Sequence, residues 1–178
     1  MNEPRPTRTV EQYLDEVLSL VAPLDDVFME PYTRAAGLTL AEPVTSRGPV
    51  PAFTNSGMDG FAVHGDDLAV GAVLLEVADV PAGSSEDPAV GSGQCARIMT
   101  GAPVPTGCDT VIQRELVTEA DGSIVVNEVV PAGANVRHPG EDLAVGDAVL
   151  APGHVLDARA LALVAACGRD EVAVVRRP

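Results

Sequence analysis

The pattern of hydrophobic and polar positions changes along the chain, from helical spacing near both ends to short alternating runs in the middle. Apolar residues recur at helical spacing between Val10 and Val21 and predict an amphipathic helix over Thr9–Val21. Thr9 and Gln12 fit a capping box, in which each side chain satisfies the other's free backbone N–H. Pro23 ends the pattern.

The segment 25–36 is expected to form a second, shorter helix. Its acidic start suits the helix dipole, and Gly37 is a natural residue to follow its end. Pro31 lies inside the segment and must kink or split such a helix. Near the other end, Asp157 is expected to cap a helix over Ala158–Cys167 that Gly168 closes.

Between these regions the pattern is typical of strands. Residues Leu38–Val44 read as a strand, followed by a Pro/Gly-rich passage over Arg47–Asn55. Short β-branched runs broken by turns then follow, and Asp121-Gly122 is a hairpin signal. The runs are Ala72–Val80, Gln94–Met99, Thr110–Val117, Ser123–Val130 and Ala148–Leu150, with a last strand at Glu171–Val175.

The sequence therefore predicts an α+β, mostly β fold. A β-rich barrel or sandwich-like domain over 47–146 is expected to be inserted into an elongated helix and strand lobe made of 1–46 plus 147–178.

Composition and charge narrow the function classes. Of the 178 residues 46% are hydrophobic but only 3% aromatic, so the core must rest on Val, Leu and Ala. The formal charge of −15 disfavours nucleic acid and anionic membranes as partners. Cys95, Cys108 and Cys167 have no metal-ligand spacing and are expected to be free thiols. With no apolar stretch that resembles a signal peptide or a membrane span, we expect a cytoplasmic protein.

Three polar, Gly-rich segments are candidates for chemistry. Phe53–Val63 gathers Asn55, Ser56 and Asp59 directly before a strand, although Asp-Gly alone is most often a hairpin turn. Thr100 and Gly101 open a loop with two prolines after a strand end.

Free N–H groups and a hydroxyl at such a loop can cradle an oxyanion, while a rigid structural loop is an equally good interpretation. In the third segment, Arg137, Glu141 and Asp142 surround a Pro-Gly turn, where a surface ion pair is the simpler explanation.

Taken together, the three segments resemble the molybdopterin molybdenumtransferases (MoeA-like proteins), a family that includes the C-terminal domain of gephyrin. Asn55–Val63 matches the family's Asn-Ser-x-Met-Asp-Gly-Tyr/Phe-Ala-Val, Thr100–Asp109 matches Thr-Gly-Ala-Pro-x-Pro-x-Gly-x-Asp, and Asn135–Asp142 matches Asn-x-Arg-x-x-Gly-Glu-Asp. The order is the family's order. Gly57 stands where Ala is usual, and Phe61 where Tyr is common.

The resemblance implies the insertion of molybdate into adenylylated molybdopterin with release of AMP, with a divalent cation such as Mg²⁺, by a homodimer. Asp59, Thr100 and Asp142 match the family's functional positions and are our catalytic candidates. Asn55, Ser56, Gly101, Arg137 and Glu141 are our candidates for binding the molybdopterin substrate. The ligands of any metal ion stay open.

The resemblance also implies that the family's molybdopterin-binding α/β domain would follow Pro178 and is absent here. We therefore expect the N-terminal half of a molybdenumtransferase, inactive by itself. One alternative is a non-catalytic dimerisation or binding module of a short homologue. Another is an unrelated β-barrel hydrolase that uses Asp59 and Asp142.

Overall fold

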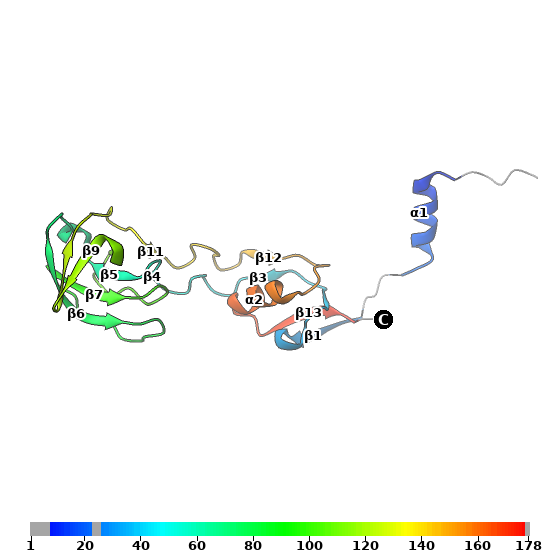
Figure 1. Ribbon diagram of the computed structural model, residues 1–178. Helices are drawn as coiled ribbons and strands as arrows, with labels where there is room; N and C mark the ends of the chain where they lie inside the picture. The colour runs from blue at the N-terminus through cyan, green and yellow to red at the C-terminus, as the bar shows by residue number, and fades with distance from the viewer. Residues whose placement is uncertain (1–7, 23–25, 177–178) are drawn as a thin grey trace, which may run out of the picture. The chain divides into compact units, whose positions relative to one another are not determined.

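The computed structural model describes residues 8–22 and 26–176, and the chain divides into two compact units. One unit is continuous and covers residues 45–147 (the sheet unit). The other is discontinuous and combines residues 1–44 with 148–178 (the terminal unit). Among the described residues two elements are α-helices and most of the others are strands (Figure 1), so the α+β, mostly β fold is confirmed.

The first helix begins where the sequence predicts. Helix α1 spans Val10–Ser19, and Thr9 forms the capping box with Gln12: the Gln12 N–H donates to the Thr9 hydroxyl at 3.2 Å, and the Thr9 N–H donates to the Gln12 amide oxygen at 3.0 Å. None of its residues is buried, so its apolar stripe is exposed along its whole length.

The predicted second helix is wrong. Of the segment 25–36, Asp25 lies outside the described residues, and the rest forms strand β1, Val27–Pro31, and a 3-10 turn η1, Tyr32–Arg34. β1 pairs antiparallel with β13, Glu171–Val175, over all five residues. Pro31 lacks an N–H and is tolerated at the end of this edge strand, whereas it would break a helix. Pairing with a distant strand thus overrides the local helical pattern.

The other strands of the terminal unit are short. β13 lies between β1 and β2, Thr39–Leu40, while β3, Val44–Thr45, pairs with β12, Ala148–Leu150. Helix α2, Ala158–Ala166, has Asp157 as its N-cap, which accepts a hydrogen bond from the Ala160 N–H at 2.8 Å. The core of the unit combines α2 with the sheet: Ala35, Leu40, Val44, Leu156, Ala160, Val164, Val172 and Val174.

The sheet unit is built on one six-stranded sheet that curls into a half-barrel (Figure 1). The strand order is β8-β5-β7-β6-β10-β9, and every neighbouring pair is antiparallel except β6 and β7. The strands are β5 Gly60–Val63, β6 Val73–Val80, β7 Gln94–Ile98, β8 Thr110–Gln113, β9 Val117–Ala120 and β10 Ser123–Val126. Two 3-10 turns, η2 Gly65–Asp67 and η3 Arg114–Leu116, connect them.

The predicted hairpin at Asp121-Gly122 is confirmed, because Ala120 pairs with Ser123 across it and Gly122 has a φ of 71°. The predicted run Thr110–Val117 is divided by η3 into β8 and β9. A separate two-stranded ladder joins β4, Asn55–Ser56, to β11, Val136–Arg137.

Both faces of the interior strand β5 are covered. Phe61 and Val63 belong to one cluster of buried residues, together with Leu74, Cys95, Ile112, Val117, Ile124 and Val126. Ala62, which points to the opposite face, belongs to another with Val80, Val90, Ala96, Ile98, Ala102 and Val111. A strand buried on both faces holds the residue just before it, Asp59, in a fixed position.

Within the described residues, no helix has the length and apolar character needed to cross a membrane. Cys95, Cys108 and Cys167 are free thiols, as expected.

Candidate functional site

Asp59 and Thr100 meet where two neighbouring strands of the half-barrel sheet, β5 and β7, begin and end. Asp59 comes directly before β5 and Thr100 follows β7, and the antiparallel register sets Gly60 opposite Ile98. The Thr100 N–H and the Thr100 hydroxyl both donate to Asp59 Oδ1, each at 2.7 Å. Sheet register therefore joins two of the three catalytic candidates, although they lie far apart in the sequence.

These hydrogen bonds stabilise the ionised form of the Asp59 carboxyl. They lower the pKa of its carboxyl below the ordinary value of 3.8, and the Thr100 N–H contributes more than the hydroxyl. Asp59 is therefore an anion at neutral pH and a weak base. The Thr100 hydroxyl donates its only proton to Asp59. In this arrangement it can therefore accept a hydrogen bond from a substrate but cannot donate one.

A cavity of about 200 Å³ lies beside Asp59. Its lining includes two arginines and a second carboxylate that sequence reasoning did not select: it consists of Asp59, Gly60, Arg97, Ile98, Met99, Arg114 and Glu115. The Arg114 N–H donates to the Asp59 carbonyl at 3.3 Å, which fixes the two residues side by side. The sequence held one signal for Arg97. It lies in one predicted strand and Glu76 lies in the predicted strand before it, so the two could pair across the sheet.

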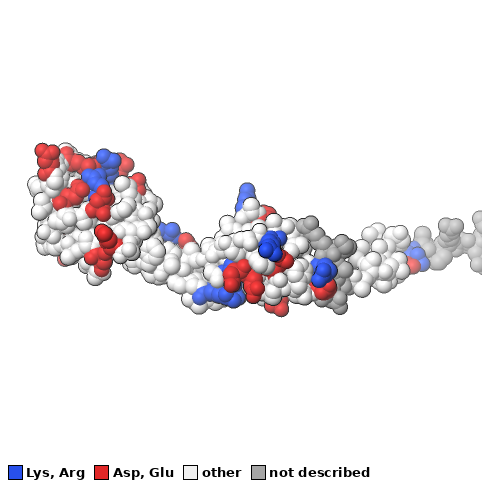
Figure 2. Space-filling model, turned by 90° about the horizontal axis from the view of Figure 1, so that it is seen from below, with Lys and Arg blue, Asp and Glu red and all other residues white. Residues whose placement is uncertain are grey.

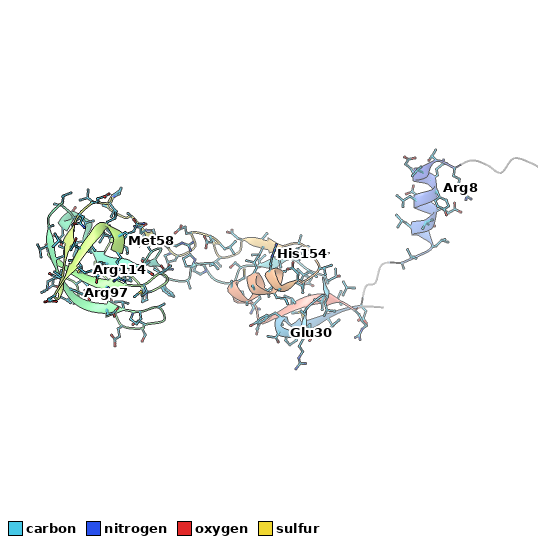
Figure 3. The ribbon with its side chains drawn as sticks, viewed as in Figure 1. Arg8, Glu30, Met58, Arg97, Arg114 and His154 are labelled. Carbon is cyan, nitrogen blue, oxygen red and sulfur yellow. The ribbon has the colours of Figure 1, made fainter. Side chains whose placement is uncertain are left out.

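The arginine charges in this cavity are largely neutralised within the protein. Arg97, labelled with Arg114 in Figure 3, donates to Glu76 through Nε at 3.2 Å and Nη2 at 3.1 Å, and to Glu119 at 2.7 Å. Its guanidinium lies 4.9 Å from the centre of the Phe61 ring. Glu119 also accepts from Arg114 Nε at 2.6 Å. Hydrogen bonds to Glu119 and then Glu76 raise the pKa of Arg97. Figure 2 likewise shows basic side chains lying beside acidic ones.

The third segment lies next to the first through the β4–β11 ladder. Arg137 is opposite Asn55, and Val136 is opposite Ser56. Arg137 Nη2 donates to Asp142 Oδ1 at 2.6 Å, and its Nε lies 3.6 Å from Glu141 Oε1. These carboxylates raise the pKa of Arg137, with the Asp142 hydrogen bond as the largest cause. The surface ion pair that the sequence suggested is therefore present.

The side chains of Asn55 and Ser56 bond within the first segment, and the Gly101 backbone joins the second segment to it. The Asn55 amide donates to the Phe53 carbonyl at 3.0 Å, and the Ser56 hydroxyl donates to the Met58 carbonyl at 2.6 Å. The Gly101 N–H donates to the Ser56 carbonyl at 2.8 Å. Because Asn55 and Ser56 are buried and these groups are engaged by backbone, they brace the loop that carries Asp59.

The segments are adjacent, but Asp142 is not among the residues that line the Asp59 cavity. Its backbone N–H donates instead to the Val50 carbonyl at 2.9 Å. Among the described residues there is no group of three or more His, Cys, Asp or Glu side chains suited to hold a metal ion.

Solved structures with the same arrangement are proteins of molybdopterin biosynthesis. The crystal structure of a molybdopterin biosynthesis moeA protein from Pyrococcus horikoshii superposes with a TM-score of 0.85 at 28% identity, over 94% of this chain and 46% of that protein. A second P. horikoshii structure of this kind gives a TM-score of 0.77 at 30% identity, over 92% and 43%.

The family model of the MoeA N-terminal region (domain I and II) matches residues 8–168, and the chain belongs to this family. It is 37% identical over 152 residues to molybdopterin molybdenumtransferase 2 of Mycobacterium tuberculosis, covering 83% of this chain and 38% of the relative. It is 40% identical over 144 residues to the molybdopterin molybdenumtransferase of Haemophilus influenzae, covering 80% and 36%. The chain thus spans less than half the length of these relatives.

Proposed function

We propose that this chain supplies the Asp59 side of the active site of a molybdopterin molybdenumtransferase, which inserts molybdate into adenylylated molybdopterin and releases AMP. The observation that carries the proposal is the carboxylate of Asp59, held by the Thr100 N–H and hydroxyl at 2.7 Å beside a cavity. Membership of the MoeA N-terminal family supports the substrate class.

The lowered pKa of Asp59 favours some roles over others. A carboxylate that is a weak base serves poorly as the group that removes a proton, since a general base works best when its pKa is near the working pH. A permanent anion with one oxygen fixed by Thr100 is suited to orient a water molecule or a protonated molybdate oxygen. Thr100 then acts by fixing Asp59.

Asp59 also suits a bound Mg²⁺, because this ion is commonly held by one or two carboxylates together with waters and substrate phosphates rather than by a full protein cage. Glu115 lines the same cavity and is the second carboxylate there. The ion would supply positive charge to the phosphates when bound. Asp59 and Glu115 would contribute the negative charge that holds it.

The acidity of the chain argues that its active site is completed by other residues. Phosphate and molybdate are anions, the formal charge is −15, and Arg97 is already bonded to two carboxylates. Unshielded carboxylates oppose such substrates by about 4 kcal/mol per pair at 4 Å in a surface-like dielectric. We therefore propose that a homodimer of the longer enzyme in the cytoplasm provides the missing cations, and that this chain alone is inactive.

The exposed stripe of α1 favours a second candidate, a non-catalytic dimerisation module. Val10, Leu14, Val17 and Leu18 are each at least 41% exposed. An isolated helix of this length is marginal in water, so the stripe is expected to be covered by a partner.

The test is Asp59→Asn in an enzyme of the relatives' full length that carries this chain. Asparagine keeps the Oδ1 acceptor for Thr100 but removes the charge, so the free energy of unfolding should stay within about 1 kcal/mol. Molybdenum cofactor formation should fall by about 10² or more if the charge acts in the reaction. The matched control is Asp121→Asn at the β9–β10 hairpin. Full activity in the Asp59 variant would leave the dimerisation module as the better proposal.

A further inference from the structure

Asn135 has a backbone conformation that residues with a side chain rarely adopt. Its φ is 58°, and among the described residues it is the only one other than glycine with a positive φ. This left-handed conformation is unfavourable for residues with a Cβ, although asparagine tolerates it better than most. It persists only where the surrounding contacts fix it, and such positions cluster at functional sites. Asn135 begins the third polar segment, two residues before Arg137.

The chain at Asn135 is fixed against strand β8 by hydrogen bonds. The Asn135 side-chain amide donates to the Val111 carbonyl at 2.9 Å, and the Val111 N–H donates to the Ala134 carbonyl at 3.0 Å. Just before these residues, the Gly133 N–H donates to the Thr110 hydroxyl at 3.0 Å. Because Thr110 and Val111 are fully buried, Asn135 is anchored to the core of the sheet unit.

The carbonyl of Asn135 extends this anchoring to the first polar segment. It accepts the Gly57 N–H at 2.8 Å, and the β4–β11 ladder begins directly after it, with Val136 opposite Ser56. The direction of a carbonyl follows from the backbone dihedrals of its residue, so the left-handed conformation of Asn135 aims this carbonyl at Gly57. Gly57 lies only two residues before Asp59.

The second polar segment bonds to the residue next to Gly57. The Gly101 N–H donates to the Ser56 carbonyl at 2.8 Å, and Asp59 accepts two hydrogen bonds from Thr100. The loop that carries Asp59 is thus held by the second segment on one side and by the third segment on the other. The bond from Gly57 is the contact that depends on the third segment's conformation.

We propose that Asn135 is a positioning residue, which sets where the Asp59 carboxylate lies relative to Arg137. Its side chain bonds β8, and its carbonyl bonds Gly57. The proposal rests on the proposed function, since this position matters only if Asp59 takes part in the reaction. Asn135 is not among the residues that line the cavity beside Asp59. It therefore acts on the reaction through the geometry of its neighbours.

The first experiment measures hydrogen exchange of the Gly57 amide by NMR in the 178-residue chain. Asn135→Gly can still adopt the left-handed conformation but loses the bond to Val111, so the chain should stay folded. The Gly57 N–H should exchange about tenfold or more faster, as expected when one anchoring hydrogen bond is lost. Asn127→Gly removes a comparable bond, to the Thr118 hydroxyl at 3.0 Å, and should leave this exchange unchanged. Unchanged exchange in Asn135→Gly overturns the proposal.

The second experiment is a double-mutant cycle on molybdenum cofactor formation, in an enzyme of the relatives' full length that carries this chain. Asn135→Gly should lower kcat by about tenfold, and in the Asp59→Asn background it should cause no further loss, because it acts through that carboxylate. Losses that multiply would show that Asn135 only supports the fold, and full activity in Asn135→Gly would also overturn the proposal. A fully active Asp59→Asn would instead overturn the proposed function, and the exchange experiment would still show whether Asn135 fixes the loop.

Discussion

Gly60 offers a sharp test of how the sheet positions Asp59. A Cβ added at Gly60 would lie far inside van der Waals contact of the Ile112 carbonyl oxygen, with the Ile112 carbonyl carbon at 3.0 Å and Gln113 Cα at 3.1 Å. These atoms belong to the backbone of β8, which is hydrogen-bonded to β5 and cannot rotate away as a side chain could. Gly60→Ala must therefore push the two strands apart next to Asp59.

Overpacking of this kind typically costs about 1–3 kcal/mol. A loss of about 1 kcal/mol lowers the melting temperature of a domain of about 100 residues by roughly 4–8 °C. Calorimetry and circular dichroism on the chain would measure the shift. The amide signal of Thr100 in an NMR spectrum would report whether its bond to Asp59 survives, and we expect it to be displaced.

Gly57→Ala is the matched control. A Cβ there would have its nearest neighbour, the Asn135 carbonyl oxygen, at 3.4 Å, which is ordinary contact. This variant should match or slightly exceed the parent, since alanine restricts the unfolded chain and gains about 0.4–1 kcal/mol at compatible sites. If the two variants melt together, the claim that close approach of β5 and β8 fixes Asp59 is refuted.

Two further predictions concern titration. Thr100→Val removes the hydrogen bond that contributes less to the lowered pKa of Asp59, so this pKa should rise part of the way toward 3.8. A ¹³C NMR titration of the carboxyl group would measure the pKa, and the control Thr106→Val should leave it unchanged. Because the folded pKa is the lower one, the stability that Asp59 contributes is present above the unfolded pKa and is lost as the pH falls through the folded value. The parent should therefore retain this contribution to lower pH than Thr100→Val, and an unchanged pKa in Thr100→Val would contradict the geometry. Burial raises the pKa of Cys95 to about 12 and that of Cys108 to about 11, with weaker contributions from nearby carboxylates. Both thiols should react slowly with iodoacetamide in the native chain at mildly alkaline pH and quickly once unfolded, and rapid native labelling in a mass-spectrometric assay would show that they are accessible.

Local signals predicted the elements that depend on local physics. Thr9 with Gln12 and Asp157 with the Ala160 N–H are caps whose donors and acceptors lie three residues apart, so the sequence contains both partners. The helix predicted over 25–36 was wrong because residues 27–31 pair with β13 at the far end of the chain. No window of neighbouring residues contains that information.

In the candidate site, too, the sequence predicted some residues, while their contacts became visible only in the structure. The motifs supplied Asp59 and Thr100, but their contact depends on the register of β5 with β7, which joins distant residues. Arg97 and Glu115 were not selected, since only the fold sets them beside Asp59 in one cavity. Likewise, only the structure shows that Asn55 and Ser56 hydrogen-bond the backbone of their own loop.

The pairing of β1 with β13 has a consequence for the order of events on the ribosome. β1 is made first, and its partner strand Glu171–Val175 is made only roughly 140 residues later. At about 5–20 residues per second, β1 waits for roughly 7–30 s. The sheet unit, which is continuous in sequence, can fold during this interval. Nascent chains released before β13 is made should therefore carry a protease-resistant sheet unit beside a terminal unit that is still open to cleavage.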